Sequence, residues 1–164
     1  MRFIALFTIA FILIVAIPTT RASENKLVNF VASYEGFRDT AYRDPTGTWT
    51  IGYGQTRDVA EGDTITESDA WDDLKLELFV IDRIIRVDHS GRFSACERHA
   101  LTSFAYNTGI GNLNRLLRGR SNDEIAEAML LYIYSKGRVL QGLVNRRADE
   151  VEMFLNCDYH RGVK

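Results

Sequence analysis

The sequence predicts a mainly helical α+β domain with one small β-hairpin, and three observations lead to this prediction. Apolar residues recur every three or four positions through most of the 164-residue chain. The period changes to two between about residues 41 and 55, where Trp49, Ile51 and Tyr53 alternate with smaller residues. With 46% hydrophobic residues, 26% charged residues and only two prolines, the composition is that of one compact domain. Collagen-like, low-complexity and disordered chains are excluded.

The first expected helix of this domain runs from the candidate N-cap Ser23 to Gly36. Its apolar residues have the spacing of one helical face, namely Leu27, Phe30, Val31 and Tyr34. Gly36 is typical of the residue that follows a helix, so Glu35 is expected on the last turn. The hairpin comes next, and residues 44–47, Asp-Pro-Thr-Gly, have the composition of its tight turn.

A long helix is expected after a loop at residues 57–64. Thr66 and Asp69 form a relative of the capping box at its start. The helix has about twenty residues and one apolar stripe, which consists of Trp71, Leu74, Leu78, Ile81 and Ile85. A helix of this length could join two lobes.

Two capping boxes predict the starts of later helices. They are Ser94-x-x-Glu97 and Ser121-x-x-Glu124, and we expect the helices to end near residues 107–109 and 135–137. A last helix should cover about residues 144–155. Its expected buried residues are Ala148, Val151, Phe154 and Leu155. No internal repeat or linker divides this part of the chain.

The N-terminal segment has the pattern of a secretory signal. Met1-Arg2 precedes fifteen uncharged and largely apolar residues, 3–17, and a polar stretch follows. At about 1.5 Å per residue, such a helix spans roughly 22 Å, less than a hydrocarbon core of about 30 Å. Thr20 and Ala22 suit the −3 and −1 positions of cleavage before Ser23. We expect 1–22 to be a transport segment and 23–164 the functional domain. The alternative, a buried core helix, would normally show a polar face.

Charge and cysteine content exclude several kinds of partner. The net charge is −2, and without residues 1–22 the count is 18 basic against 22 acidic residues, so no nucleic-acid partner is expected. The histidines and cysteines have no metal-ligand spacing, so we expect no metal and no cofactor. We also expect a monomer. In an oxidising compartment Cys96 and Cys157 could form a disulfide worth roughly 4 kcal/mol in the chain-entropy model. Buried thiols are the alternative, and the sequence leaves both open.

Glu35 and Asp44 are the candidate catalytic carboxylates. A glycosidase needs one carboxyl group held protonated and another held ionised, and a hydroxyl such as that of Thr50 can orient water. Each residue also has a simpler explanation, because Glu is common in helices, Asp favours turns and Thr favours strands. Spacing alone therefore leaves catalysis open.

Three stretches resemble one known family. Residues 35–54, EGFRDTAYRDPTGTWTIGYG, are similar to the active-site signature of the phage-type lysozymes, the endolysins of glycoside hydrolase family 24. Residues 100–109, ALTSFAYNTG, and 142–147, GLVNRR, resemble later helices of that family in the expected order. The resemblance implies a lysozyme-like fold with a small hairpin lobe, a long connecting helix, a helical lobe and a peptidoglycan-binding cleft between the lobes.

The resemblance also implies roles for the three candidates. Glu35 would be the general acid, Asp44 the second catalytic carboxylate and Thr50 the residue that holds the attacking water. The reaction would hydrolyse the β-1,4 bond between N-acetylmuramic acid and N-acetylglucosamine, for lysis of a host cell. Inversion is the expected stereochemistry, which requires carboxyl groups roughly 6.5–9.5 Å apart.

Four further positions follow from the resemblance. Arg146 would pair with the catalytic glutamate, and burial must then outweigh the guanidinium if Glu35 is to keep a proton. Tyr106 and Asn107 would contact the sugar chain. The alternative for Arg146 is a solvated helix residue. The alternative for Tyr106 and Asn107 is packing or helix termination. Relatives commonly have His where this chain has Gln55, and we expect its amide to affect lobe stability more than chemistry.

Some members of the family carry a signal-anchor-release segment that tethers the enzyme to the inner membrane. Residues 3–17 could make this transient membrane contact, but they lack the Gly/Ala richness of such anchors. We therefore favour a cleaved signal peptide. Either segment places the domain outside the cytoplasmic membrane, in the periplasm or the extracellular space.

Two other functions remain open. A lytic transglycosylase cuts the same bond without water and would have little use for Asp44 and Thr50. An inactive peptidoglycan-binding module on the same scaffold would be expected to lack Glu35 or Asp44.

Overall fold

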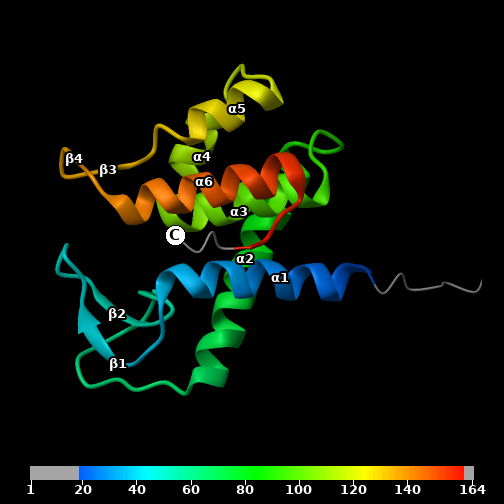
Figure 1. Ribbon diagram of the computed structural model, residues 1–164. Coiled ribbons are helices and arrows are strands. Elements are labelled where there is room, and N and C mark those ends of the chain that lie inside the picture. The colour runs from blue at the N-terminus through cyan, green and yellow to red at the C-terminus, as the bar shows by residue number, and fades with distance from the viewer. Residues whose placement is uncertain (1–18, 161–164) are drawn as a thin grey trace, which may run out of the picture.

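The computed structural model describes the backbone of residues 19–160 and the side chains of residues 25–160 as two lobes joined by a long helix (Figure 1). The helices α3 to α6 gather in one lobe, the hairpin β1–β2 forms the other, and α2 runs between them. The elements follow in the order α1 (Thr19–Glu35), β1 (Arg38–Arg43), β2 (Trp49–Gly52), α2 (Glu67–Asp88), α3 (Ala95–Thr108), α4 (Ile110–Leu117), α5 (Asn122–Met129), β3 (Tyr134–Ser135), β4 (Arg138–Val139) and α6 (Gln141–Asn156). The predicted fold class is confirmed.

The first helix starts earlier than the sequence analysis predicted. It begins at Thr19, so Ser23 lies inside the helix and is not its N-cap. No Gly or Pro occurs between Pro18 and Gly36, and the helix occupies the whole of that stretch. The expected cleavage position before Ser23 falls within α1. The apolar segment 3–17 lies outside the described residues, and no helix within residues 19–160 has the length and apolar character needed to cross a membrane.

The hairpin fixes the relative positions of a strand and a turn. The strands β1 and β2 are antiparallel, with Tyr42 opposite Thr50. Arg38 pairs with Gly52, so β1 contains extra residues that form a bulge. Residues 44–47 form the predicted turn between the strands, where the Gly47 N–H donates to the Asp44 carbonyl at 2.9 Å.

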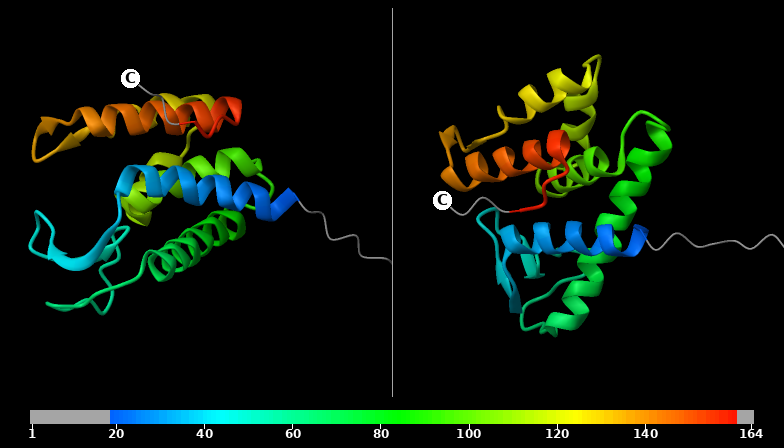
Figure 2. Two further views of the ribbon diagram at one scale, coloured as in Figure 1. Left: turned by 60° about the horizontal axis from the view of Figure 1, so that its bottom comes forward. Right: turned by 45° about the vertical axis from the view of Figure 1, so that its right-hand side comes forward.

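The long helix α2 begins and packs as predicted. The Asp69 N–H donates to the Thr66 hydroxyl, which caps the helix. Four residues of the predicted stripe are buried, namely Leu74, Leu78, Ile81 and Ile85, and Trp71 packs partly buried against the core. This stripe faces the protein interior where α1 crosses α2 and α3 packs against it (Figure 2).

The helical lobe is built around α3. Both predicted capping boxes form, at Ser94 with Glu97 and at Ser121 with Glu124. Because α3 packs between α2 and α6, its side chains are buried on nearly all sides from residue 99 to residue 105. The core of this lobe has residues from α3, α4, α5 and α6. They include Leu101, Phe104, Leu113, Ile125, Met129, Met153 and Phe154.

The sequence analysis missed one helix of this lobe and placed the end of another wrongly. Helix α4 was not predicted, because Gly109 separates it from α3 and its eight residues give only a short apolar pattern. The helix that starts after Ser121 ends at Met129, not near residues 135–137. Lys136 and Gly137 both have positive φ angles and form the two-residue turn of the hairpin β3–β4.

The buried face of α6 also differs from the prediction. Phe154 is buried as expected, but Ala148 and Val151 are only partly buried and Leu155 is 53% exposed. The helix instead turns Arg146, Arg147, Asp149, Glu150 and Met153 inward. Most of the side chains on the interior face of α6 are charged, so the spacing of its apolar residues did not identify the face that is buried.

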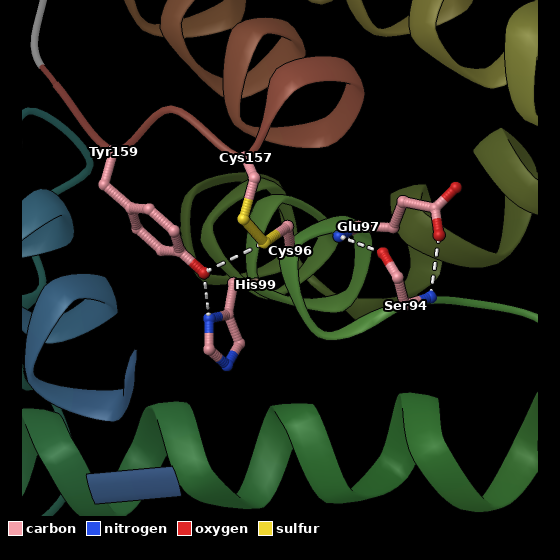
Figure 3. Close-up of a disulfide and its surroundings, with 6 residues drawn as sticks. All are labelled: Ser94, Cys96, Glu97, His99, Cys157 and Tyr159. Carbon is pink, nitrogen blue, oxygen red and sulfur yellow. Dashed lines mark hydrogen bonds between the residues drawn. A yellow bond between two sulfur atoms is a disulfide. The ribbon is translucent and has the colours of Figure 1, made fainter. Parts of the chain in front are cut away.

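The C-terminal segment is tied to the start of α3. Cys96 and Cys157 form a disulfide, with their Cα atoms 5.2 Å apart (Figure 3). The Tyr159 hydroxyl lies 2.7 Å from Nδ1 of His99 and 3.7 Å from Sγ of Cys96. Burial lowers the pKa of His99. The disulfide and the Tyr159 contacts together hold the chain after α6 against α3.

Candidate active site

Glu35 lies at the junction of α1 and the hairpin. It is the last residue of α1, because Gly36 has a φ of +70° and its N–H closes the helix on the Ala32 carbonyl at 3.1 Å. The Glu35 side chain is 21% exposed, so it is open to solvent on one side only. The turn at Gly36 thus places the Glu35 carboxylate where Arg146 of α6 reaches it.

Arg146 of α6 pairs with this carboxylate. Its Nη1 donates to Glu35 Oε1 at 2.6 Å, its Nε to Glu150 Oε1 at 3.1 Å and its Nη2 to the Ser103 carbonyl at 3.3 Å. Burial lowers the pKa of Arg146, but the carboxylates of Glu150 and Glu35 outweigh burial and raise it above its ordinary value. The guanidinium is therefore a buried cation in a fixed orientation.

A glycine and a tyrosine border Glu35 on the hairpin side. A Cβ atom at Gly54 would lie 3.9 Å from Glu35 Oε2 and 3.5 Å from the Tyr106 hydroxyl, so a side chain there would enter the space beside the carboxylate. The Tyr106 hydroxyl donates to the Tyr53 carbonyl at 2.8 Å, which links α3 to the hairpin lobe. Burial raises the pKa of Tyr106, so the phenol stays neutral.

Asp44 is held by the turn that follows β1. Its Oδ1 accepts the N–H of Thr46 at 2.8 Å, the Thr46 hydroxyl at 2.7 Å and the N–H of Thr48 at 2.9 Å. The Thr46 hydroxyl and the Thr48 N–H lower the pKa of Asp44, because they stabilise its charged form. Asp44 is thus an ionised carboxylate with a fixed orientation.

Thr50 is connected to Asp44 through Thr48. Its hydroxyl donates to the Thr48 carbonyl at 3.2 Å, while the N–H of Thr48 donates to Asp44. The Thr50 side chain is buried in β2. Because its proton is engaged by a carbonyl, the hydroxyl oxygen can accept a hydrogen bond from water.

The two predicted sugar-contacting residues make protein contacts. Tyr106 bridges the lobes as described, and Oδ1 of the exposed Asn107 accepts from Arg147 Nη2 at 3.0 Å. Gln55 also has a structural contact, since its amide accepts from the Tyr53 N–H and donates to the Ala70 carbonyl. This amide connects the hairpin loop to α2, as expected for a residue that stabilises the lobe.

The sequence analysis missed Glu150. This fully buried carboxylate contacts the same guanidinium as Glu35. Its i, i+4 spacing from Arg146 was the one signal in the sequence, and this spacing is also usual on a solvated helix face. No group of three or more His, Cys, Asp or Glu side chains capable of holding a metal ion occurs within the part of the chain that the structure describes.

Comparison with known proteins places these features in a family. The sequence profile described as Phage lysozyme matches residues 32–150. The chain is 34% identical over 140 residues to the endolysin of Bacillus phage B103, an alignment that covers 78% of this chain and 52% of the relative. It is 33% identical over 127 residues to the SAR-endolysin of Bacteriophage PS119, covering 74% of this chain and 76% of the relative. The chain thus spans about half the length of the first of these relatives.

The muramidase domain of SpmX from Asticaccaulis excentricus is a similar solved structure. It superposes with a TM-score of 0.69 at 34% identity, and the match covers 83% of this chain and 96% of that chain. The fold of this chain is therefore similar to the fold of that domain over most of both chains.

Proposed function

The chain belongs to the phage lysozyme family, and we propose that it is an endolysin that lyses a host cell by cutting its peptidoglycan. In this proposal it hydrolyses the β-1,4 bond between N-acetylmuramic acid and N-acetylglucosamine. The observation that carries the proposal is the placement of Glu35 against Arg146 at the junction where the hairpin with Asp44 and Thr50 begins.

The proposed roles follow from the environment of each side chain. Glu35, partly shielded from solvent, protonates the leaving oxygen. Asp44, kept ionised by its three hydrogen bonds on Oδ1, acts as the base on the opposite face of the sugar. Thr50 accepts a hydrogen bond from the attacking water. Tyr106 and Asn107, held by their contacts with the hairpin and α6, bind the sugar chain.

The products distinguish hydrolysis from the two alternatives. The turn that holds Asp44 ionised favours hydrolysis, since a transglycosylase needs no such base. We expect purified peptidoglycan sacculi digested by the full chain to give fragments with reducing ends by mass spectrometry. Anhydro-muramic ends would instead identify a lytic transglycosylase. Binding to sacculi without any fragment release would identify an inactive module.

Substitution of Thr46 should change the pH dependence of activity. The Thr46 hydroxyl lowers the pKa of Asp44, so its loss in Thr46→Val raises that pKa, and the base becomes protonated at a higher pH. The acidic side of the pH–rate profile should therefore move to higher pH by about half a unit. Thr46→Ser keeps the hydroxyl and should match the unsubstituted chain. A profile that moves to lower pH in Thr46→Val would contradict the role of Asp44 as an ionised base.

We also propose that the N-terminal segment carries the domain across the cytoplasmic membrane. The charged start and the apolar residues 3–17 support this, as does the similarity to a protein named SAR-endolysin. Cleavage before Ser23 predicts that the exported protein begins at that residue. N-terminal sequencing tests this, and an exported protein that begins at Met1 would show that the segment is retained.

A further inference from the structure

A second carboxylate lies behind the candidate acid. Glu150 of α6 is completely buried, one helical turn beyond Arg146. Its Oε1 accepts hydrogen bonds from the Ser103 hydroxyl at 2.7 Å, from Arg146 Nε at 3.1 Å and from Arg147 Nη2 at 3.1 Å. A fully buried carboxylate with this many donors occupies one defined position.

Arg146 therefore connects two carboxylates of different exposure. Its Nη1 reaches Glu35, which solvent also reaches, whereas its Nε is held by Glu150 inside the protein. We propose that Glu150 is a positioning residue that holds Arg146 and balances its charge, so that Glu35 can carry and donate a proton. This inference rests on the proposed function, because it assigns a role within the same catalytic site.

The charge balance explains why such a residue is needed. A guanidinium 2.6 Å from Glu35 favours the ionised carboxylate, which opposes the function of a general acid. Arg147 adds a second buried cation, with its Nε 2.9 Å from Glu150 Oε2. Without the charge of Glu150, the Arg146 guanidinium would lose one of the two carboxylates that it pairs with, and its charge would act on Glu35 with less compensation.

The charged and titratable groups that face Glu35 from other elements do not compensate the charge of Arg146 as Glu150 does. Glu77 on α2 interacts electrostatically with Glu35, and Arg57 in turn with Glu77. Tyr106 on α3 stays neutral, and Tyr42 on β1 interacts with it. Within residues 25–160, none of the four makes a hydrogen bond or ion pair with Glu150. A substitution at Glu150 therefore leaves their contacts in place.

The remaining charged group near this cluster is Asp149. It accepts a hydrogen bond from the Tyr34 hydroxyl of α1, whose ring also lies against the Arg146 guanidinium. Asp149 thus joins α6 to α1 through the Tyr34 hydroxyl. Glu150 is the buried carboxylate placed to take up the charge of Arg146 on the side away from Glu35.

The test is the pH dependence of Glu150→Gln, measured on peptidoglycan with the full chain. Gln keeps an oxygen that can accept from Arg146 but removes the charge. We expect the alkaline side of the kcat profile to move to lower pH by about one unit, with KM little changed. A residue with only a structural role would lower thermal stability without moving the profile.

Two further variants separate the charge effect from destabilisation. Ser103→Ala removes a hydrogen bond to Glu150 but no charge, so its Tm should fall while its profile stays in place. Glu150→Asp withdraws the carboxylate by one methylene and should move the profile in the same direction by less. If Glu150→Gln does not fold, Glu150→Asp gives the decisive measurement.

The outcomes distinguish this inference from the proposed function. An unmoved alkaline side in both Glu150 variants, or the same movement in Ser103→Ala, overturns the positioning role while wild-type hydrolysis leaves the endolysin proposal standing. Absence of hydrolysis by the wild-type chain overturns both. Movement confined to the two Glu150 variants supports the inference.

Discussion

Replacing Glu35 with Gln is expected to reduce peptidoglycan hydrolysis by about 10³-fold, the scale of losing general acid catalysis. Gln has nearly the same shape, but it has no proton to donate to the leaving oxygen. The chain should still fold, since Arg146 keeps its contacts with Glu150 and Ser103. Release of dye from labelled sacculi measures the activity, and co-sedimentation with unlabelled sacculi measures wall binding, which should persist.

A matched control is Glu127→Gln. This substitution removes an exposed carboxylate on α5, in the helical lobe and away from the junction that holds Glu35. It should leave hydrolysis unchanged. Wild-type activity in Glu35→Gln would remove Glu35 from the mechanism, whatever its contact with Arg146.

Loss of the disulfide is expected to have the largest effect on stability. The bond joins residues 61 positions apart, and the chain-entropy model gives about 4 kcal/mol for a loop of this size. Urea unfolding of a Cys96→Ser/Cys157→Ser variant should therefore show a free energy of unfolding lower by that amount. Hydrolysis at 25 °C should change little, because Cys157 follows the end of α6 whereas Arg146 lies near its start.

Reduction of the unsubstituted chain provides the control for this prediction. A reducing agent should lower the stability of the wild-type protein to that of the double serine variant, and it should not affect the variant. A loss below about 1 kcal/mol in both experiments would show that the Tyr159 and core contacts hold the C-terminal segment without the bond.

Helix starts were predictable because the signals for them are local. The Ser94 and Ser121 capping boxes and the Thr66 cap need only residues three positions apart, and each forms as expected. Ser23 failed as such a signal because α1 continues past it towards the N-terminus. A serine marks a helix start only where the preceding residues leave the helical conformation.

The interior of α6 could not be predicted from apolar spacing. Arg146, Arg147 and Glu150 are buried where both arginines pair with Glu150 and where Ser103 of α3 donates to it, which depends on how two distant helices pack. The hairpin β3–β4 was missed for a related reason. Its strands have two residues each, too few to show an alternating pattern.

The residues of the candidate site also differ in whether local sequence patterns could identify them. The residues of the 35–54 stretch could be named from the sequence, because helix end, turn and strand follow one another along the chain. The contact between Glu35 and Arg146 joins residues 111 positions apart and was expected only from the family resemblance. Glu150 required the packed structure, since only burial distinguishes it from a surface carboxylate.

The configuration of the first sugar released is the most direct measurement of whether Glu35, Asp44 and Thr50 act on one glycosidic bond. Proton NMR of a soluble peptidoglycan oligomer can record the muramic acid anomer before it equilibrates. We predict the α anomer, because water held by Asp44 and Thr50 attacks from the face opposite the oxygen that Glu35 protonates. Initial release of the β anomer would contradict this arrangement.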